Sequence, residues 1–253
     1  MSFKVVIPAR MKSSRLPGKP LADIGGKPMV VRVAECAMAS GAESVVVAVD
    51  DERVAEVCQE VGVSWVMTAA DHPTGTDRLA EAVTKLGFDD NDIVVNLQGD
   101  EPLMPVDVIN KVAQLLSQRE DCAIATAAHT IYDVNSFLDP NVVKVVLDEN
   151  NTALTFSRAP IPWPRDHFRK DKASLPADMV ALHHLGIYAY RVGFLRRYPT
   201  LQQAPMEAFE SLEQLRALYY GEKIAVAVLD ASLPAGVDTQ EDLERVRKIY
   251  RQN

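Results

Sequence analysis

The 253-residue sequence contains few cysteines, and their spacing argues against two kinds of cysteine-based site. Cys36, Cys58 and Cys122 are odd in number, widely separated and set in apolar stretches, so a disulfide framework is not expected. No pair has the C-x-x-C spacing that is typical of a zinc knuckle or a redox dithiol. We interpret all three as small core residues, because unpaired cysteine is usually buried.

Long apolar runs and a positive net charge are also absent. No run approaches the roughly 20 residues that span a bilayer, and residues 1–8 are too short and too quickly interrupted for a signal peptide. We therefore expect no membrane insertion and a cytoplasmic location. The formal net charge of -8 argues against nucleic-acid binding, which usually shows a basic domain. Any anion-binding site must then be built locally.

The two common glycine-rich phosphate-binding signatures are missing as well. The sequence contains neither G-x-x-x-x-G-K-[ST] nor G-x-G-x-x-G, and the first expected strand ends at Pro8, Ala9 and Arg10. The absence of both motifs argues against a P-loop nucleotidase and against a nicotinamide-dependent oxidoreductase.

The first hundred residues alternate between short β-branched runs and helical patterns. Such alternation, with strands that are apolar throughout, predicts βαβ units and a mostly parallel sheet that helices cover on both faces. The expected fold class is therefore α/β with three layers. The expected strands are residues 5–7, 44–49, 65–67 and 93–96, and the expected helices are residues 28–39, 52–61 and 76–86.

The pattern changes after about residue 120. Residues 142–147 and 153–156, joined by a turn, resemble a β-hairpin that a purely doubly wound fold does not need. Residues 159–176 are rich in proline and charge, and we interpret them as a mobile loop or an interface arm. The remaining expected strands are residues 123–128, 185–190 and 224–229, and the remaining expected helices are residues 206–218 and 239–250.

A basic loop at residues 8–20 carries the strongest local signal. Arg10, Lys12, Arg15 and Lys19 fall within ten positions, and no acidic residue occurs between residues 3 and 22 of this net acidic chain. The loop leaves the first strand at the edge where ligands bind in open α/β sheets. Charge alone would equally fit a solvated loop, but this position favours an anion-binding site, for which a triphosphate has the appropriate charge.

Further motifs occur in order along nearly the whole chain. With IPAR at residues 7–10 and RLPGKPL at residues 15–21, they resemble the CMP-acidic-sugar synthetases, most closely the branch that activates 3-deoxy-manno-octulosonate (Kdo). The other matching motifs are GTDRLAE at 75–81, VNLQGDEP at 95–102, NVVKVVL at 141–147, FSR at 156–158, HLGIY at 184–188, LEQLR at 212–216 and GVDT at 236–239.

This resemblance implies a Rossmann-like nucleotidyltransferase that transfers CMP from CTP to Kdo and releases pyrophosphate, for lipopolysaccharide synthesis. It also implies Mg²⁺ as cofactor and a homodimer. We expect a single nucleotidyltransferase domain over residues 1–253. Within it, about residues 120–200 are expected to form a smaller β-rich subdomain or dimerisation arm that also binds the sugar.

The resemblance also implies roles for individual residues. The expected catalytic residues are Lys19, Arg10 and Asp100, and the expected metal ligands are Asp100 and Asp238. The expected nucleotide contacts are Ala9, Arg10, Arg15, Lys19, Thr74, Gly75 and Gln98. The expected sugar contacts are Arg78, Gln98, Arg158, His184, Tyr188, Glu213 and Gln214.

From spacing alone, the two aspartates have ordinary structural alternatives. Asp100 follows a glycine and precedes Pro102, as turn residues often do. Asp238 stands three residues before Glu241, the arrangement of a helix N-cap. One departure from the family is His183, where arginine is expected; it loses a permanent charge and is expected to titrate near neutral pH.

Three alternatives to Kdo transfer remain open. A related cytidylyltransferase would act on another acidic sugar, such as a sialic-acid-like nonulosonate or an amino-Kdo. A nicotinamide-dependent oxidoreductase is disfavoured, because the sequence lacks the glycine-rich motif that this class needs. A catalytically inactive scaffold is disfavoured by the presence of Lys19, Asp100 and Asp238.

Overall fold

A mixed nine-stranded sheet runs through the molecule, whose computed structural model describes residues 2–13 and 15–252. A small second sheet is formed by β2 (Asp23–Ile24) and β3 (Lys27–Pro28). Along the main path of seven strands, neighbours are parallel except for β10, which lies between β6 and β7 and is antiparallel to both. The mostly parallel sheet is therefore confirmed. In spatial order the strands are β11 (Ile224–Leu229), β7 (Ile124–Thr130), β10 (Leu182–Arg191), β6 (Ile93–Asn96), β1 (Lys4–Ala9), β4 (Ser44–Val49) and β5 (Ser64–Met67).

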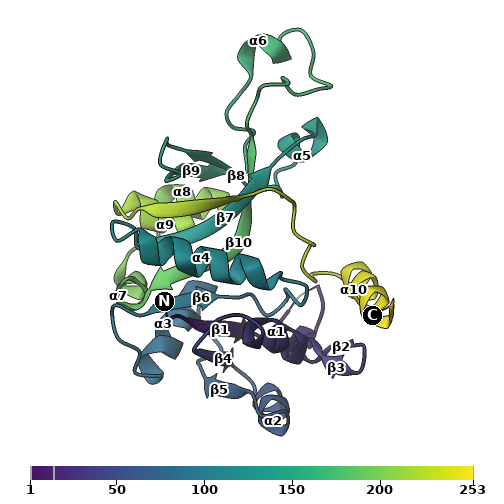
Figure 1. Ribbon diagram of the computed structural model, residues 1–253, viewed down its shortest axis with the longest axis vertical. Coiled ribbons are helices and arrows are strands. Elements are labelled where there is room, and N and C mark those ends of the chain that lie inside the picture. Colours follow the sequence, from purple (N-terminus) through teal and green to yellow (C-terminus); the bar gives the residue numbers. More distant parts are fainter. Residues whose placement is uncertain (1, 14, 253) are drawn as a thin grey trace.

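Helices cover both faces of this sheet, so the three expected layers are present (Figure 1). Strand β1 shows why, because Val5 and Ile7 enter one hydrophobic core and Val6 enters the other. The first core is closed by α1 (Met29–Met38), α2 (Glu52–Glu60), α4 (Val106–Gln118) and α10 (Gln240–Gln252). The second is closed by α3 (Gly75–Lys85), α7 (Val192–Arg197) and α9 (Gln214–Tyr219).

Several elements differ from the expected pattern, three of them in the central sheet or the helices that cover it. Helix α4 was not predicted, although its buried apolar residues follow a helical period. The helix expected at residues 206–218 is two helices, α8 (Pro205–Glu210) and α9, because Ser211 adopts a left-handed conformation with φ of 52°. The strand expected at residues 185–190 is longer and forms β10.

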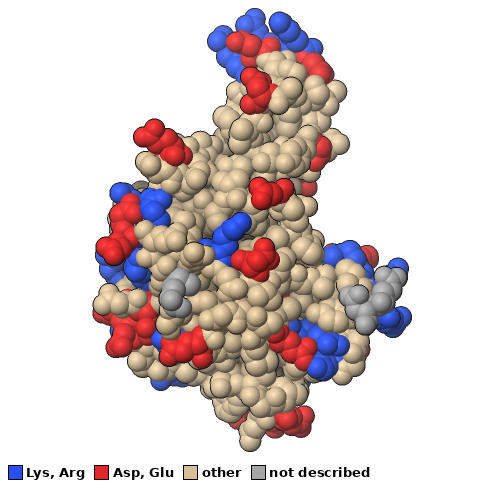
Figure 2. Space-filling view, in the orientation of Figure 1, with Lys and Arg blue, Asp and Glu red and all other residues tan. Residues whose placement is uncertain are grey.

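The predicted β-hairpin is present, formed by β8 (Lys144–Leu147) and β9 (Ala153–Ser157). Beyond it, residues 159–180 form an arm that projects from the sheet and carries α6 (Arg165–Phe168) at its tip (Figure 1). Lysine and arginine side chains gather on that tip (Figure 2). Phe168 packs in a small separate core with Phe137 of α5 (Val134–Leu138), so the arm has hydrophobic support of its own.

Strands β7 and β10 fall within residues 120–200 but belong to the central sheet. Between them in the chain, β8 pairs with the start of β10 and β9 pairs with β8, while the arm projects away from the sheet. The prediction of one domain with a subdomain at about 120–200 stays a prediction.

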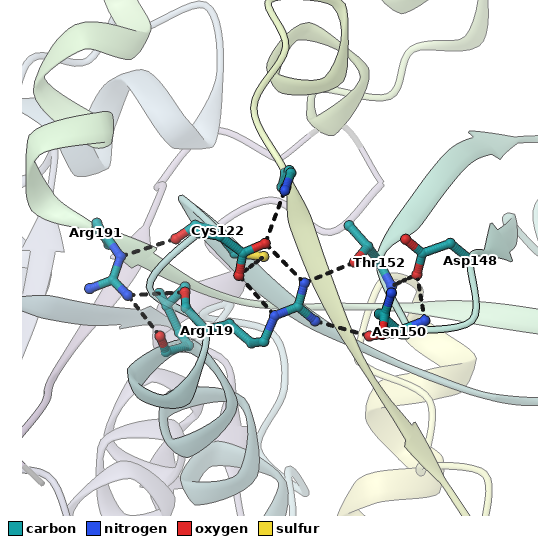
Figure 3. Close-up of polar contacts among 9 residues, drawn as sticks. Arg119, Cys122, Asp148, Asn150, Thr152 and Arg191 are labelled. Carbon is teal, nitrogen blue, oxygen red and sulfur yellow. Dashed lines mark hydrogen bonds and ion pairs between the residues drawn. The ribbon is translucent and has the colours of Figure 1, made fainter.

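Two arginines tie the hairpin turn and β10 to the end of α4 (Figure 3). Arg119 donates hydrogen bonds to the Asn150 carbonyl and to Thr152 Oγ1, both in the turn. Arg191, the last residue of β10, donates to the carbonyls of Leu116 and Arg119 at the end of α4. The Arg191 bonds add to the backbone N–H groups of Arg119 and Cys122, which already bond to these two helix-end carbonyls.

The described cysteines carry no disulfide, and Cys58 and Cys122 are buried as expected while Cys36 is half-buried. Within residues 2–13 and 15–252, no helix is long and apolar enough to cross a membrane. The cytoplasmic location stays a prediction.

Candidate active site

A cavity of about 720 Å³ lies at the carboxyl ends of β1 and β6, where parallel strands usually present ligand sites. Its size suits a nucleotide or another small molecule. The lining joins the basic loop to residues of α3, β10 and the α8–α9 turn. It includes Ala9, Arg10, Lys12, Ser13, Arg15, Lys19, Gly75, Thr76, Asn96, Gln98, Asp100, Gly186, Tyr188, Tyr190, Ser211, Glu213, Gln214 and Asp238.

Local backbone geometry places Lys19 in this cavity. Gly18 adopts φ of 69°, a left-handed conformation that glycine takes without strain, and caps the short 3₁₀ helix η1 (Lys19–Leu21). Gly99 brings the end of β6 against β1, because a Cβ there would lie only 2.6 Å from the Pro8 carbonyl oxygen. This approach places Asp100, the residue after Gly99, near the end of β1, where the basic loop begins.

Lys19 lies between the two predicted metal ligands. Its Nζ donates to Asp100 Oδ2 at 2.7 Å, to Asp238 Oδ1 at 3.0 Å and to the Val237 carbonyl at 3.0 Å. Burial disfavours the charged ammonium, but the two carboxylates outweigh it and the pKa of Lys19 is raised. The ammonium stays fully charged at neutral pH.

Asp100 and Asp238 converge on one point and are partly open to solvent, with side-chain exposures of 31% and 49%. Among residues 2–13 and 15–252 no cluster of three or more histidine, cysteine or acidic side chains could hold a metal. Two carboxylates nevertheless fit Mg²⁺, which commonly takes its remaining ligands from water and substrate phosphates. The donor set therefore suits a cation that arrives with a nucleotide.

The alternative role of Asp238 as a helix cap is not what the geometry shows. Its carboxylate contacts Lys19 and, at 3.1 Å, Arg15. The start of α10 is capped by Thr239 and Asp242 instead, through the Asp242 N–H to Thr239 Oγ1 and the Thr239 N–H to Asp242 Oδ2.

Glu101 lies beside this carboxylate pair and was not among the predicted site residues. Burial, together with the charges of Asp100 and Asp238, raises the pKa of Glu101 to about 8. Gly236 permits the approach, because a Cβ there would lie 2.8 Å from Glu101 Oε1. The site therefore has a third carboxyl group that is protonated at neutral pH.

The lining of the cavity also presents hydroxyl, amide and carboxylate groups. Glu213 Oε2 accepts a hydrogen bond of 2.7 Å from Thr76 Oγ1, which joins the α8–α9 turn to the start of α3. Gln214 is 7% exposed, and its Nε2 makes no hydrogen bond to a described residue. Burial raises the pKa of Tyr188 well above its usual value, so its phenol is a neutral hydrogen-bonding group.

Four predicted contact residues do not line this cavity. Arg78 is fully buried and donates to Asp50 Oδ2 at 3.0 Å and to Thr68 Oγ1 at 2.7 Å. Thr74 caps α3 by accepting from the Asp77 N–H at 3.1 Å. Their predicted contacts with ligands stay predictions.

The other two predicted contact residues outside the cavity, Arg158 and His184, lie near the base of the hairpin and arm. Arg158 donates to the carbonyls of Glu210 and Pro140. His184 packs behind Tyr188, with ring centroids 5.3 Å apart, and burial lowers its pKa to about 3. The expectation that His183 titrates near neutral pH is wrong. Burial, with His129 and Lys144 nearby, lowers its pKa to about 4.

Several cavity residues were not predicted as contacts, notably Thr76, Asn96, Gly186 and Tyr190. A usable signal existed for Asn96, since it is a polar residue ending an otherwise apolar strand. Thr76 lies in the GTDRLAE motif, in which only Gly75 and Arg78 were expected to make contacts. Tyr190 gave no signal, because it lies in a run of ordinary strand residues.

The chain belongs to the cytidylyltransferase family, whose family model matches residues 4–224. It is similar to the solved structure of a CMP:2-keto-3-deoxy-manno-octonic acid synthetase complexed with CTP. The two are 41% identical, with 99% of this chain and 98% of that chain covered and a TM-score of 0.90. A cytidylyltransferase from Leptospira borgpetersenii serovar Hardjo-bovis shares the fold, with a TM-score of 0.62 at 16% identity over 100% of this chain and 87% of that chain.

Proposed function

We propose that this cytidylyltransferase transfers CMP from CTP to Kdo, giving CMP-Kdo and pyrophosphate for lipopolysaccharide synthesis. One observation carries the proposal: a single cavity joins a cationic loop, two carboxylates bridged by Lys19, and a wall of amide, hydroxyl and carboxylate groups. A nucleotide triphosphate and a polyhydroxylated acceptor need these two kinds of surface side by side. The similarity to a synthetase named for the same sugar acid supports Kdo as the acceptor.

In this reaction the anomeric hydroxyl oxygen of Kdo attacks the α-phosphorus of CTP. A new oxygen–phosphorus bond forms, the bond to the bridging oxygen breaks, pyrophosphate leaves, and the hydroxyl proton is released. Arg10, Arg15 and Lys19 hold the triphosphate and stabilise the charge that grows on the leaving pyrophosphate. Ala9, Gly75 and Gln98 line the same cavity and complete the nucleotide-binding surface.

Asp100 and Asp238 are the residues that would hold Mg²⁺. When bound, such an ion neutralises phosphate charge and favours ionisation of the attacking hydroxyl. Both carboxylates line the cavity, and Lys19 Nζ lies within hydrogen-bond distance of each.

Gln98, Tyr188, Glu213 and Gln214 contact the sugar in our proposal, since all four line the cavity. Arg78 and His184 act as positioning residues instead. Arg78 fixes the start of α3 against Asp50, and His184 supports the ring of Tyr188.

We also propose a homodimer that pairs through the arm side of the molecule. Tyr132, Trp163 and Val180 are 82%, 51% and 67% exposed, and they lie at the arm or beside its base. Large exposed apolar side chains gathered in one region commonly mark an interface.

The test of the function is pyrophosphate release from CTP in the presence of Kdo and Mg²⁺. We expect release that requires all three components. Parallel reactions with a sialic-acid-like nonulosonate and with amino-Kdo identify the preferred acceptor. A higher kcat/KM for either would replace Kdo in the proposal, and no release with any acceptor would favour a nucleotide-binding scaffold.

A further inference from the structure

Asn96 is a buried amide without a protein partner at the wall of the active-site cavity. It ends strand β6, is 2% exposed and lines the cavity. Its Oδ1 is buried and makes no hydrogen bond within the described part of the chain.

Such a group is costly to keep. Most buried side-chain polar atoms in folded proteins have a hydrogen-bond partner, and a buried one without a partner destabilises the native state. A leucine of similar shape would avoid that cost. An unpaired amide in the wall of a binding cavity is therefore explained when a ligand supplies the missing hydrogen bond.

The neighbours of Asn96 indicate which ligand that is. Asn96 lies directly opposite Tyr188 in the β6–β10 pairing. Gln214, the other cavity amide with a buried unpaired atom, lies on α9 in the same lining. One presents an unpaired acceptor and the other an unpaired donor, which together match hydroxyl groups, since a hydroxyl both donates and accepts.

The phosphate-binding cations lie elsewhere in the lining. They are carried by the loop that follows β1, and Lys19 contacts Asp100, four residues beyond Asn96. An amide oxygen that accepts a hydrogen bond is also unsuited to a phosphate oxygen, which only accepts. The chemistry around Asn96 therefore suits a hydroxyl group rather than the triphosphate. Its pairing with Tyr188, a proposed sugar contact, favours the acceptor sugar over the ribose of CTP.

We propose that Asn96 is a specificity-determining residue whose amide oxygen accepts a hydrogen bond from a hydroxyl of the acceptor sugar. The inference rests on the proposed function, because it assigns the residue to the acceptor half of that site. A site built to pair with a substrate hydroxyl rejects an analogue that lacks it, since its own polar group is then left buried and unpaired.

The experiment replaces Asn96 by leucine and measures the KM for Kdo, the KM for CTP and the melting temperature. We expect the KM for Kdo to rise by roughly tenfold to a hundredfold, because one buried hydrogen bond to the sugar is lost. The KM for CTP stays unchanged. The melting temperature is kept or raised, because the apolar side chain removes an unpaired buried amide. Asn96→Ala is assayed in parallel and should show the same rise if the leucine variant does not fold.

Asn110→Leu is the matched control. Its amide oxygen accepts a 3.0 Å hydrogen bond from the Gly41 N–H, away from the cavity. The same replacement there should lower the melting temperature and leave both KM values unchanged. This opposite pattern separates loss of a structural hydrogen bond from loss of a ligand contact.

Acceptor analogues that each lack one hydroxyl complete the test. The unmodified protein should discriminate against one analogue that Asn96→Leu accepts as readily as Kdo. An unchanged KM for Kdo in both Asn96 variants, or a rise confined to the KM for CTP, would overturn the inference. Absence of pyrophosphate release by the unmodified protein with Kdo would instead overturn the proposed function, so the two failures are distinguishable.

Discussion

At the scale of single residues, Lys19 is the cation on which the proposed site depends most. We expect Lys19→Ala to reduce turnover by roughly 10²–10³-fold, because a preorganised charge at the leaving group is lost. The stability loss should stay near 1 kcal/mol, since the two partner carboxylates are partly solvated. Pyrophosphate-release kinetics and chemical denaturation measure the two effects.

Lys27→Ala is the control for this variant. Lys27 forms an exposed ion pair with Glu35 and does not line the cavity. It should change neither turnover nor stability appreciably. Near-normal turnover in Lys19→Ala would remove this lysine from the catalytic assignment.

Glu101 gives a second prediction at this scale. Its native pKa of about 8 exceeds the ordinary glutamate value of 4.5. Between these pH values the native state holds a proton that the unfolded state has released, so stability falls as pH rises from about 4.5 to about 8. Glu101→Gln removes this dependence.

Melting temperatures measured across this pH range without divalent cations test the prediction. The advantage of Glu101→Gln over the unmodified protein should grow as pH rises and become constant above pH 8. A difference in melting temperature between the two proteins that stays the same at every pH would contradict the prediction.

At the scale of elements, a buried ion pair holds the α8–α9 turn that presents Glu213 and Gln214. Arg216 on α9 donates two hydrogen bonds to Glu207 on α8, at 2.6 and 2.8 Å, and both residues are buried. Arg216→Met leaves the Glu207 charge without its partner and should cost about 3–5 kcal/mol.

The double variant Glu207→Gln with Arg216→Met buries no charge and should recover much of that loss in urea denaturation. Equal stabilities of the single and double variants would show that lost packing, rather than the unpaired carboxylate, causes the destabilisation. The KM for Kdo in the double variant reports separately on the placement of the turn.

The elements themselves were largely predictable from sequence. The continuous apolar strands and the hairpin were found because burial on both faces and a polar turn leave clear patterns. Helix α4 has a helical period as well and could have been predicted. The break at Ser211 could not, because the left-handed conformation of a serine has no local sequence signature.

The site was predictable mainly as a set of motifs. The sequence could not show that Arg78 is committed to Asp50, since that partner comes from another strand end. The sequence also could not show that Lys144 is fully buried and donates to the carbonyls of Asp139 and Arg158. The contacts of Arg78 with Asp50 and of Lys144 with Arg158 depend on how the elements pack together.

At the scale of the whole molecule, the arm side is the proposed dimer interface. We expect light scattering to give twice the 27.8 kDa chain mass for the unmodified protein. Replacing Tyr132 and Val180 together by serine removes exposed apolar area and should shift the mass toward that of one chain.

Trp65→Ser is the matched control, because Trp65 is exposed on edge strand β5, at the end of the molecule opposite the arm (Figure 1). It should leave the mass unchanged. A single-chain mass for the unmodified protein at micromolar concentration would refute the dimer.

The contact of Lys19 with both Asp100 and Asp238 has a thermodynamic consequence. Lysine and a divalent cation compete for the same two carboxylates, and a bound triphosphate offers the lysine another anionic partner. Nucleotide binding should therefore tighten cation binding, and by reciprocity the cation tightens nucleotide binding by the same factor. Titration calorimetry should find weak Mg²⁺ affinity without CTP, strong affinity with it, and a much smaller difference in Lys19→Ala. One side chain would thus make the arrival of the two ligands cooperative.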